Sequence, residues 1–236
     1  MIEKIYRNKV KIFLIGGNSL IGKSVLNGIT KKYETEEIEI ISFARSKIKE
    51  KIPGKVVFVN NYIESIDLIN KESSEDKSKK IIIISYGVLV EEKKNKDLSE
   101  NLIYHLEINT FQQYEILKRL ININNLLEVH IVSSILGDFI RPSLYSYSTS
   151  KSLLELLIDN LNIYKEKIFI WKPAFVQSQL NIGRKESFLK TSPDKIEKIV
   201  SKKFVGGKYY IPSISVIFTF VAKYTSPLIK WIDEKY

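Results

Sequence analysis

The sequence predicts an α/β fold: a single Rossmann-like domain in which a doubly wound parallel sheet carries helices on both faces. Three observations lead to this prediction. Short runs rich in isoleucine and valine recur along the chain, longer stretches with helical periodicity separate them, and the first run ends in a glycine turn. Strands that helices cover on both sides show this continuous apolar pattern. No repeat or low-complexity linker divides residues 1–236, so we expect one domain.

Six apolar runs are expected to form the strands of the sheet. They are rich in β-branched side chains, which favour strands. The clearest helical patterns span Ile21–Ile29 and Tyr147–Leu161. The mixed-charge stretch Lys71–Lys80 is expected to be a surface connection. In chain order, the expected strands are Lys11–Ile15, Ile38–Phe43, Val56–Val59, Ile81–Ser85, Val129–Ser133 and Ile168–Trp171.

Composition excludes several classes of protein. The chain has no cysteine and two histidines, which excludes disulfide scaffolds, thiolate metal sites and cysteine nucleophiles, and no metal centre is expected. The 37 Lys and Arg outnumber the 27 Asp and Glu, which gives a formal net charge of +10. This excess predicts an anionic partner: nucleic acid, an acidic membrane surface or a phosphorylated small molecule. The chain has no recognised nucleic-acid motif, so we expect no nucleic-acid partner.

A glycine turn joins the first expected strand to the first expected helix. Gly16 would allow a tight turn, and Gly22 would allow the helix to pack closely on the sheet. A helix that begins at such a turn binds a pyrophosphate through its backbone N–H groups and its dipole. The spacing differs from G-x-G-x-x-G, and an ordinary strand–helix turn is an equally good interpretation. The residues between the glycines that we expect at a cofactor are Asn18, Ser19, Leu20 and Ile21.

The second expected strand ends close to Arg45. At this position in dinucleotide-binding folds, an acidic residue binds the ribose hydroxyls of NAD, whereas a basic residue accommodates the 2′-phosphate of NADP. We therefore favour NADP(H) over NAD(H) as the cofactor. The alternative interpretation is an ordinary solvated arginine on the surface.

Ser134, Tyr147 and Lys151 form the strongest candidate for a catalytic site. Tyr147 and Lys151 are four residues apart, which places both side chains on one face of a helix. A neighbouring ammonium lowers the pKa of a phenol, so a tyrosine in such a pair can act as a general acid or base near neutral pH. Ser134 follows an expected strand, at the edge of the sheet where α/β folds bind ligands. The Tyr–Lys spacing taken alone also arises by chance in a chain with 13 tyrosines.

With these residues in this order, the chain resembles the short-chain dehydrogenases and reductases. Ser134 precedes Tyr147 by 13 residues, as in the active site of that family, and the resemblance covers about residues 9–215. It implies that Asn109, in a long helix before the serine strand, is the fourth catalytic residue. It also implies that Tyr147 and Lys151 contact the cofactor. Further positions that it assigns to the cofactor site are Asn60, Ser85, Tyr86, Gly87, Pro173, Val176 and Ser178.

The resemblance implies a reaction as well. An oxidoreductase of this kind transfers hydride between nicotinamide and a ketone or a secondary alcohol. In the reductive direction Tyr147 would donate a proton to the substrate oxygen, and Ser134 would bind the same oxygen. Lys151 would lower the pKa of the tyrosine and hold the nicotinamide ribose, and Asn109 would position a water that relays protons. A non-catalytic dinucleotide-binding protein with the same fold is the alternative, and the intact catalytic set argues against it.

Some segments are similar to one subgroup of the family, which reduces a decaprenyl-phosphate-linked 2-keto-ribose. The similarity lies in GGNSLIG at residues 16–22 and in S-S-x-x-G at residues 133–137. It implies a keto-sugar or lipid-linked sugar as substrate. The chain departs from the family at Leu20, where a middle glycine is usual, and at Ala174, where a glycine follows the proline.

The C-terminal part of the chain carries most of the excess positive charge. Residues 184–236 contain 11 Lys and Arg against five Asp and Glu, and Ser213–Lys235 is rich in apolar and aromatic side chains. One interpretation is a final helix packed on the sheet or on a second subunit, and the resemblance implies a homodimer or homotetramer. The other is a segment that rests on an anionic membrane. No run is long enough to span a bilayer and no signal peptide is evident, so we expect a cytoplasmic protein, with peripheral membrane contact under the second interpretation.

Overall fold

A parallel β-sheet forms the centre of the molecule. The computed structural model describes residues 9–48, 51–74, 76–92, 98–161, 165–178 and 189–225. Its strands are β1 (Lys9–Ile15), β2 (Glu37–Ala44), β3 (Lys55–Phe58), β4 (Lys79–Ile84), β5 (Leu126–Val132), β6 (Ile168–Pro173) and β7 (Gly207–Ile211). They lie in the order β3-β2-β1-β4-β5-β6-β7, and neighbouring strands are parallel throughout. The winding direction reverses between β1 and β4, where open α/β sheets bind their ligands.

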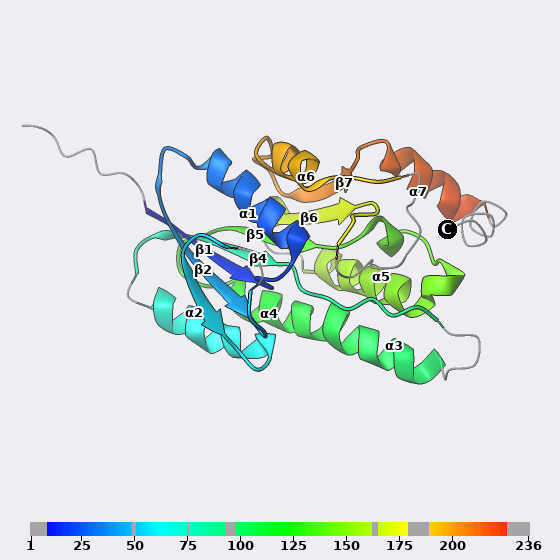
Figure 1. Cartoon of the computed structure of the whole chain (residues 1–236), viewed down its shortest axis with the longest axis horizontal. Helices are drawn as coiled ribbons and strands as arrows, with labels where there is room; N and C mark the ends of the chain where they lie inside the picture. Colours follow the sequence, from blue (N-terminus) through cyan, green and yellow to red (C-terminus); the bar gives the residue numbers. More distant parts are fainter. Residues whose placement is uncertain are drawn as a thin grey trace, which may run out of the picture.

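Helices cover both faces of this sheet (Figure 1). They are α1 (Leu20–Lys32), α2 (Ser65–Ser73), α3 (Leu98–Leu106), α4 (Gln112–Leu120), α5 (Tyr145–Asp159), α6 (Pro193–Val200) and α7 (Ser215–Tyr224). The short turns are η1 (Tyr62–Glu64), η2 (Glu107–Phe111, a π-helical turn), η3 (Ile135–Gly137), η4 (Pro142–Leu144) and η5 (Lys165–Lys167). Helices α1 and α6 pack together on one face, and α2, α4 and α5 lie on the other. The predicted doubly wound parallel sheet is therefore confirmed.

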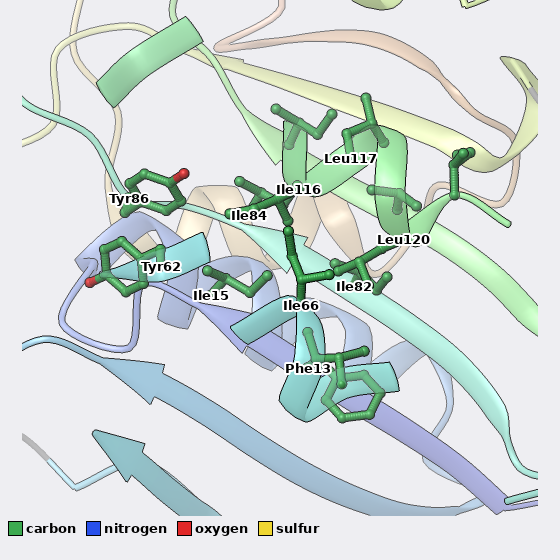
Figure 2. Packing of buried hydrophobic residues seen from close by; sticks show 14 of the residues in the cluster. Phe13, Ile15, Tyr62, Ile66, Ile82, Ile84, Tyr86, Ile116, Leu117 and Leu120 are labelled. Atoms are coloured by element: carbon green, nitrogen blue, oxygen red, sulfur yellow. The ribbon is translucent and has the colours of Figure 1, made fainter. Parts of the chain in front are cut away.

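The isoleucine-rich strands supply both halves of the hydrophobic core. Along β1, Phe13 and Ile15 face α2, α4 and α5, whereas Ile12 and Leu14 face α1 and α6, and all four are fully buried. Strand β4 alternates in the same way, and Figure 2 shows side chains of α2 and α4 packed against one face of these two strands. Each such side chain contributes about 1.5–3 kcal/mol on burial, which is why the central strands need no polar alternation.

The structure confirms the expected strands and helices, with shifts at their ends. All six predicted runs lie in strands β1 to β6, and the two clearest helical patterns lie in α1 and α5. Strand β7 extends the sheet beyond β6. Within the described ranges, no helix is both long enough and apolar enough to cross a membrane.

The prediction that Lys71–Lys80 is a surface connection is wrong at both ends of this stretch, which belong to a helix and a strand. Helix α2 continues to Ser73, and β4 begins at Lys79. Lys80 is fully buried, and its ammonium donates hydrogen bonds to the carbonyl oxygens of Asp76, at 2.6 Å, and Ser78, at 3.0 Å. Burial lowers the pKa of Lys80, and the two carbonyls partly replace the lost water. Charge alone was therefore a poor guide to exposure here.

Candidate active site

The glycine turn between β1 and α1 fits closely against the end of β4. Gly16 has a φ of +108°, and a Cβ there would lie 2.8 Å from the backbone nitrogen of Tyr86. A Cβ on Gly22 would lie 2.1 Å from the hydroxyl of Ser85. Ser19 caps α1, because its hydroxyl accepts a hydrogen bond of 3.0 Å from the nitrogen of Gly22. Both glycines thus bring the N-terminus of α1 to the switch point of the sheet, where an anion is favoured.

A cavity of about 700 Å³ opens at this turn. The predicted cofactor residues that line it are Gly16, Asn18, Ser19, Leu20, Ile21, Arg45, Ser85, Tyr86, Gly87 and Ser178. Its other described lining residues are Lys23, Ser46 and Tyr62. Gly22 lies beneath the cavity in the packing of α1 on β4, as shown above. The other predicted cofactor residues are not among the described lining residues: Asn60, Tyr147, Lys151, Pro173 and Val176. The exposed Asn60 donates its N–H to Glu64 instead.

Two tyrosines and an arginine form one end of the cavity. The rings of Tyr62 and Tyr86 stack at 4.2 Å, and they lie side by side in Figure 2. The guanidinium of Arg45 lies 5.1 Å from the centre of the Tyr62 ring, within the range of a cation–π contact. The amide of Asn18 donates hydrogen bonds to the carbonyl and the hydroxyl of Ser46, at 3.1 and 3.0 Å. These contacts hold the Arg45 segment beside the glycine turn.

Sequence reasoning missed Lys23 and Tyr62. Lys23 lies in the first turn of α1, where a cation opposes the helix dipole unless an anion is bound nearby. That unfavourable placement next to a glycine turn is the signal that could have found it. Tyr62 carried no comparable signal, because it reaches the cavity only through the fold of η1 against β4.

Helix α5 carries Tyr147 and Lys151 side by side on one face, as predicted. Tyr147 is half-buried, whereas Lys151 is 3% exposed. The ammonium of Lys151 donates a hydrogen bond of 3.1 Å to the carbonyl of Val132, at the end of β5. Burial lowers the pKa of Lys151 to about 8, against a smaller opposing effect from the carboxylate of Glu155. A buried ammonium and a half-buried phenol thus lie one helical turn apart on α5.

Ser134 lies two residues after the end of β5, just before the turn η3. It is 8% exposed and caps η3, and its hydroxyl accepts a hydrogen bond of 3.2 Å from the nitrogen of Leu136. The η3 turn packs on α5. Gly137 allows this contact, since a Cβ there would lie 2.6 Å from a carboxylate oxygen of Glu155. The structure therefore brings the Ser134 segment and the Tyr–Lys helix together.

Asn109 lies in the π-helical turn between α3 and α4, and it is fully buried. Its side chain clamps the backbone of Val88: the amide oxygen accepts from the Val88 N–H at 2.8 Å, and the amide nitrogen donates to the Val88 carbonyl at 2.9 Å. The same nitrogen donates to the hydroxyl of Ser150 at 3.2 Å. A Cβ on Gly87 would lie 2.9 Å from the Asn109 oxygen and 3.9 Å from the Lys151 ammonium. These residues are therefore close neighbours at the end of β4.

A buried ionic network lies beneath the candidate site, and no sequence pattern indicated it. The ammonium of Lys172, on β6, bonds both carboxylate oxygens of Glu155, at 2.8 and 2.6 Å, and one of Asp138, at 2.7 Å. The hydroxyl of Ser133 donates to Glu155 at 2.6 Å. Lys208, on β7, lies 3.4 Å from the same carboxylate. The network ties the ends of three strands to α5.

The segment after β6 passes along the same edge of the sheet. Pro173 ends β6, and the nitrogen of Ala174 donates to the carbonyl of Ile211 at 2.8 Å. Val176 is 2% exposed and packs into the core on the α1 side, whereas Ser178 lines the cavity. Of Pro173, Val176 and Ser178, only Ser178 is among the described residues that line the cavity.

Comparison with known proteins identifies the fold. No family model and no curated protein matches the sequence. Among solved structures, a short-chain dehydrogenase from Burkholderia cenocepacia in complex with NADP is 17% identical with a TM-score of 0.70, over 91% of this chain and 92% of that one. An aldohexose dehydrogenase from Thermoplasma acidophilum is 16% identical with a TM-score of 0.66, over 87% and 92%. A 3-oxoacyl-[acyl-carrier protein] reductase from Brucella melitensis is 13% identical with a TM-score of 0.66, over 90% and 98%. This chain therefore has the fold of the short-chain dehydrogenases and reductases.

Proposed function

We propose that this chain is an NADP(H)-dependent oxidoreductase of the short-chain dehydrogenase/reductase family, which transfers hydride between nicotinamide and a ketone or secondary alcohol. One observation carries the proposal. Helix α5 presents Tyr147 and a buried Lys151 one turn apart, at the edge of the sheet that holds the cavity. An ammonium one helical turn from a phenol favours the phenolate, and proton transfer needs such a phenol whereas binding of a dinucleotide does not. This placement supports catalysis over the non-catalytic alternative.

The cavity fits a dinucleotide. At Gly16 and Gly22 the backbone approaches β4 more closely than a Cβ permits, and the N-terminus of α1 opens toward an anion. Lys23 and Arg45 add positive charge to the lining, and Tyr62 offers an aromatic face. An arginine at this position suits the 2′-phosphate of NADP rather than the bare ribose of NAD.

Fluorescence titration with NADPH and NADH tests the cofactor proposal. The wild type should bind NADPH at least about tenfold more tightly, because a charge-assisted hydrogen bond to phosphate contributes about 1.5–3 kcal/mol. Arg45→Glu should remove that preference. Lys47→Glu changes an exposed charge two residues away that does not line the cavity, and it should leave the preference unchanged. Equal affinity of the wild type for both nucleotides would reject the NADP(H) assignment.

The four predicted catalytic residues would divide the chemistry among them. Bound nicotinamide would supply or accept the hydride. Tyr147 would hold the proton that the substrate oxygen takes up during reduction, and the Ser134 hydroxyl would donate a hydrogen bond to that oxygen. Lys151, whose pKa of about 8 leaves it mainly protonated at pH 7, would favour the phenolate. The side-chain amide of Asn109 is bonded to the backbone of Val88, so we assign this side chain to holding that segment. The water expected to relay protons would then bind to the backbone of Asn109.

A catalytic variant tests the reaction. Tyr147→Phe should lose nearly all NADPH-dependent turnover of a ketone and still bind NADPH. Tyr145→Phe removes an exposed hydroxyl two residues earlier and is the matched control. The ketone panel should include free keto-sugars and a lipid-linked 2-keto-pentose, which are the substrates we propose. Full activity in Tyr147→Phe would overturn the assignment of the proton donor.

The outer face of α7 supports the proposed contact with an anionic membrane. Ile217, Phe220 and Tyr224 are 62%, 66% and 69% exposed there, and Lys223 is exposed beside them. Apolar and aromatic groups with a neighbouring lysine suit the interface of an acidic bilayer. Phosphatidylglycerol vesicles should sediment the wild type and the Phe204→Ser control, which changes an exposed ring before β7, but not Phe220→Ser. No sedimentation of the wild type at low salt would reject this contact.

Pairing of two copies is the second proposed contact. Helices α3 and α5 pack together and expose Ile103 at 66% and Leu156 at 57%. Large apolar side chains this exposed favour burial against another protein surface. We expect a dimer or tetramer by analytical ultracentrifugation, and Leu156→Glu should shift it toward monomer. A monomeric wild type at micromolar concentration would exclude this assembly.

A further inference from the structure

The helix that carries Tyr147 begins without a cap of its own. Its N-cap residue, Leu144, has no side-chain oxygen to accept a hydrogen bond from the first turn. The carboxylate of Glu92 fills this place from another part of the chain. One of its oxygens accepts a hydrogen bond of 2.8 Å from the nitrogen of Ser146, and the Glu92 nitrogen donates to the carbonyl of Ser143 at 3.1 Å. The segment after β4 thereby caps α5 from outside, one residue before Tyr147.

The same carboxylate is held in place from α3. Its second oxygen accepts a hydrogen bond of 2.8 Å from the amide of Asn101. The backbone carbonyl of Asn101 lies 2.8 Å from the Nδ1 of His105, whose Nε2 accepts the Val90 N–H at 3.1 Å. His105 therefore carries its proton on Nδ1 and donates it to Asn101. Burial opposes ionisation of Glu92, but the bonds from Ser146 and Asn101 lower its pKa, so it stays charged at pH 7.

These contacts close around Tyr147. The ring of His105, which is fully buried, meets the Tyr147 ring edge to face at 6.3 Å. Asn109 accepts a hydrogen bond from the Val88 nitrogen, and His105 accepts one from the nitrogen of Val90, two residues later. Side chains from α3 and the π-helical turn thus hold the otherwise irregular segment 88–92 at every second residue. The segment that follows Gly87 is therefore held in place against the N-terminal turn of α5.

We propose that Glu92 and His105 are positioning residues, which fix the N-terminal turn of α5 and the Tyr147 ring for proton transfer. The proposal rests on the proposed function only for its effect on turnover. A displacement of 1 Å at a reacting group can reduce a rate about a hundredfold, so holding this turn has a catalytic consequence. The effect of Glu92 on the backbone of the first turn of α5 does not depend on whether the protein catalyses a reaction.

Two measurements on Glu92 variants test the proposal. In Glu92→Ala, hydrogen exchange of the peptide covering residues 145–151 should rise roughly five- to tenfold, because its first turn loses a cap. In the same variant kcat for ketone reduction should fall about tenfold or more, with the KM for NADPH unchanged. Glu92→Gln keeps an oxygen for the Ser146 N–H and should recover most of both. Glu100→Ala removes an exposed carboxylate from α3 and should change neither.

The outcomes separate this proposal from the proposed function. Unchanged exchange at residues 145–151 in Glu92→Ala would overturn the cap, as would an equal rise across the whole sheet. Unchanged kcat together with faster exchange would overturn the positioning role. If the wild type reduces no ketone of the panel, the proposed function fails, and the exchange result still decides whether Glu92 caps α5. His105→Phe, which keeps a ring against Tyr147 but loses both nitrogen contacts, should reproduce the exchange effect of Glu92→Ala.

Discussion

Replacing Lys151 with methionine should stabilise the protein while it removes a proposed catalytic group. Burial lowers the pKa of Lys151 from 10.5 to about 8. One pKa unit corresponds to about 1.4 kcal/mol, so the folded state loses about 3 kcal/mol by keeping this ammonium charged at pH 7. Methionine has a similar length and carries no charge, but it gives up the hydrogen bond to Val132, which contributes about 1 kcal/mol. We therefore expect the free energy of unfolding to rise by about 2 kcal/mol.

The dependence on pH gives this prediction a second test. The pKa of Lys151 is lower in the folded chain, so between about pH 8 and 10.5 the unfolded chain holds more protons. Stability of the wild type should therefore gain relative to the variant as pH rises through this window. Urea unfolding followed by circular dichroism, at pH 7 and again at pH 9.5, measures both values. The advantage of Lys151→Met should be full at pH 7 and smaller at pH 9.5.

Lys172 provides the matched control. It is as deeply buried as Lys151, but its ammonium is paired with the carboxylates of Glu155 and Asp138. Lys172→Met removes the ammonium that bonds both carboxylates, although Lys208 still lies 3.4 Å from Glu155, and it should destabilise the protein by about 3–5 kcal/mol. If Lys151→Met were destabilising to a similar extent, the reasoning that Lys151 is a charge buried at a net loss would be refuted.

Three further predictions concern the core and the cavity. Gly22→Ala should lower the free energy of unfolding by about 1–3 kcal/mol, because its Cβ meets the Ser85 hydroxyl; an unchanged melting temperature would contradict the packing described. Burial lowers the pKa of His130 below 6.5 although Glu128 opposes this, so stability should fall as pH drops below about 6.5. His130→Asn should show a smaller loss between pH 7 and pH 5 in thermal unfolding. Lys23→Ala should weaken NADPH binding about threefold to tenfold in a fluorescence titration, whereas a cavity that takes an uncharged ligand predicts no change.

Strands and the Tyr–Lys pair were predictable because their signals are local. A run such as Ile81–Ile84 is apolar on both faces, and this alone favours a strand at the centre of a covered sheet. Tyr147 and Lys151 are four residues apart, so the helical repeat alone brings their side chains together. The close approach at Gly22 was also foreseen, because a glycine just inside a helix after a glycine turn needs a reason.

The polar contacts of the site were not predictable, because each depends on residues far apart in the sequence. Lys172 has the same immediate neighbourhood as any lysine near the end of a strand, and only the fold places it between Glu155 and Asp138. Glu92 likewise bonds both Asn101 and Ser146 only because α3 packs against α5. Such networks are set by tertiary packing, and a lysine or glutamate in the sequence is more often solvated than buried.

The π-helical turn Glu107–Phe111 determines which changes the long α3–α4 segment can accept. Successive residues of a helix are rotated by about 100° about its axis. Inserting or deleting one residue in the turn would therefore rotate the side chains of α3 relative to those of α4 by about this angle. Deleting a residue there would swing Asn101 and His105 away from the segment that they hold, even if Asn109 kept its place. Within this helix a change of length is therefore more damaging than most changes of side chain, and relatives that share its geometry should keep its residue count while their sequences diverge.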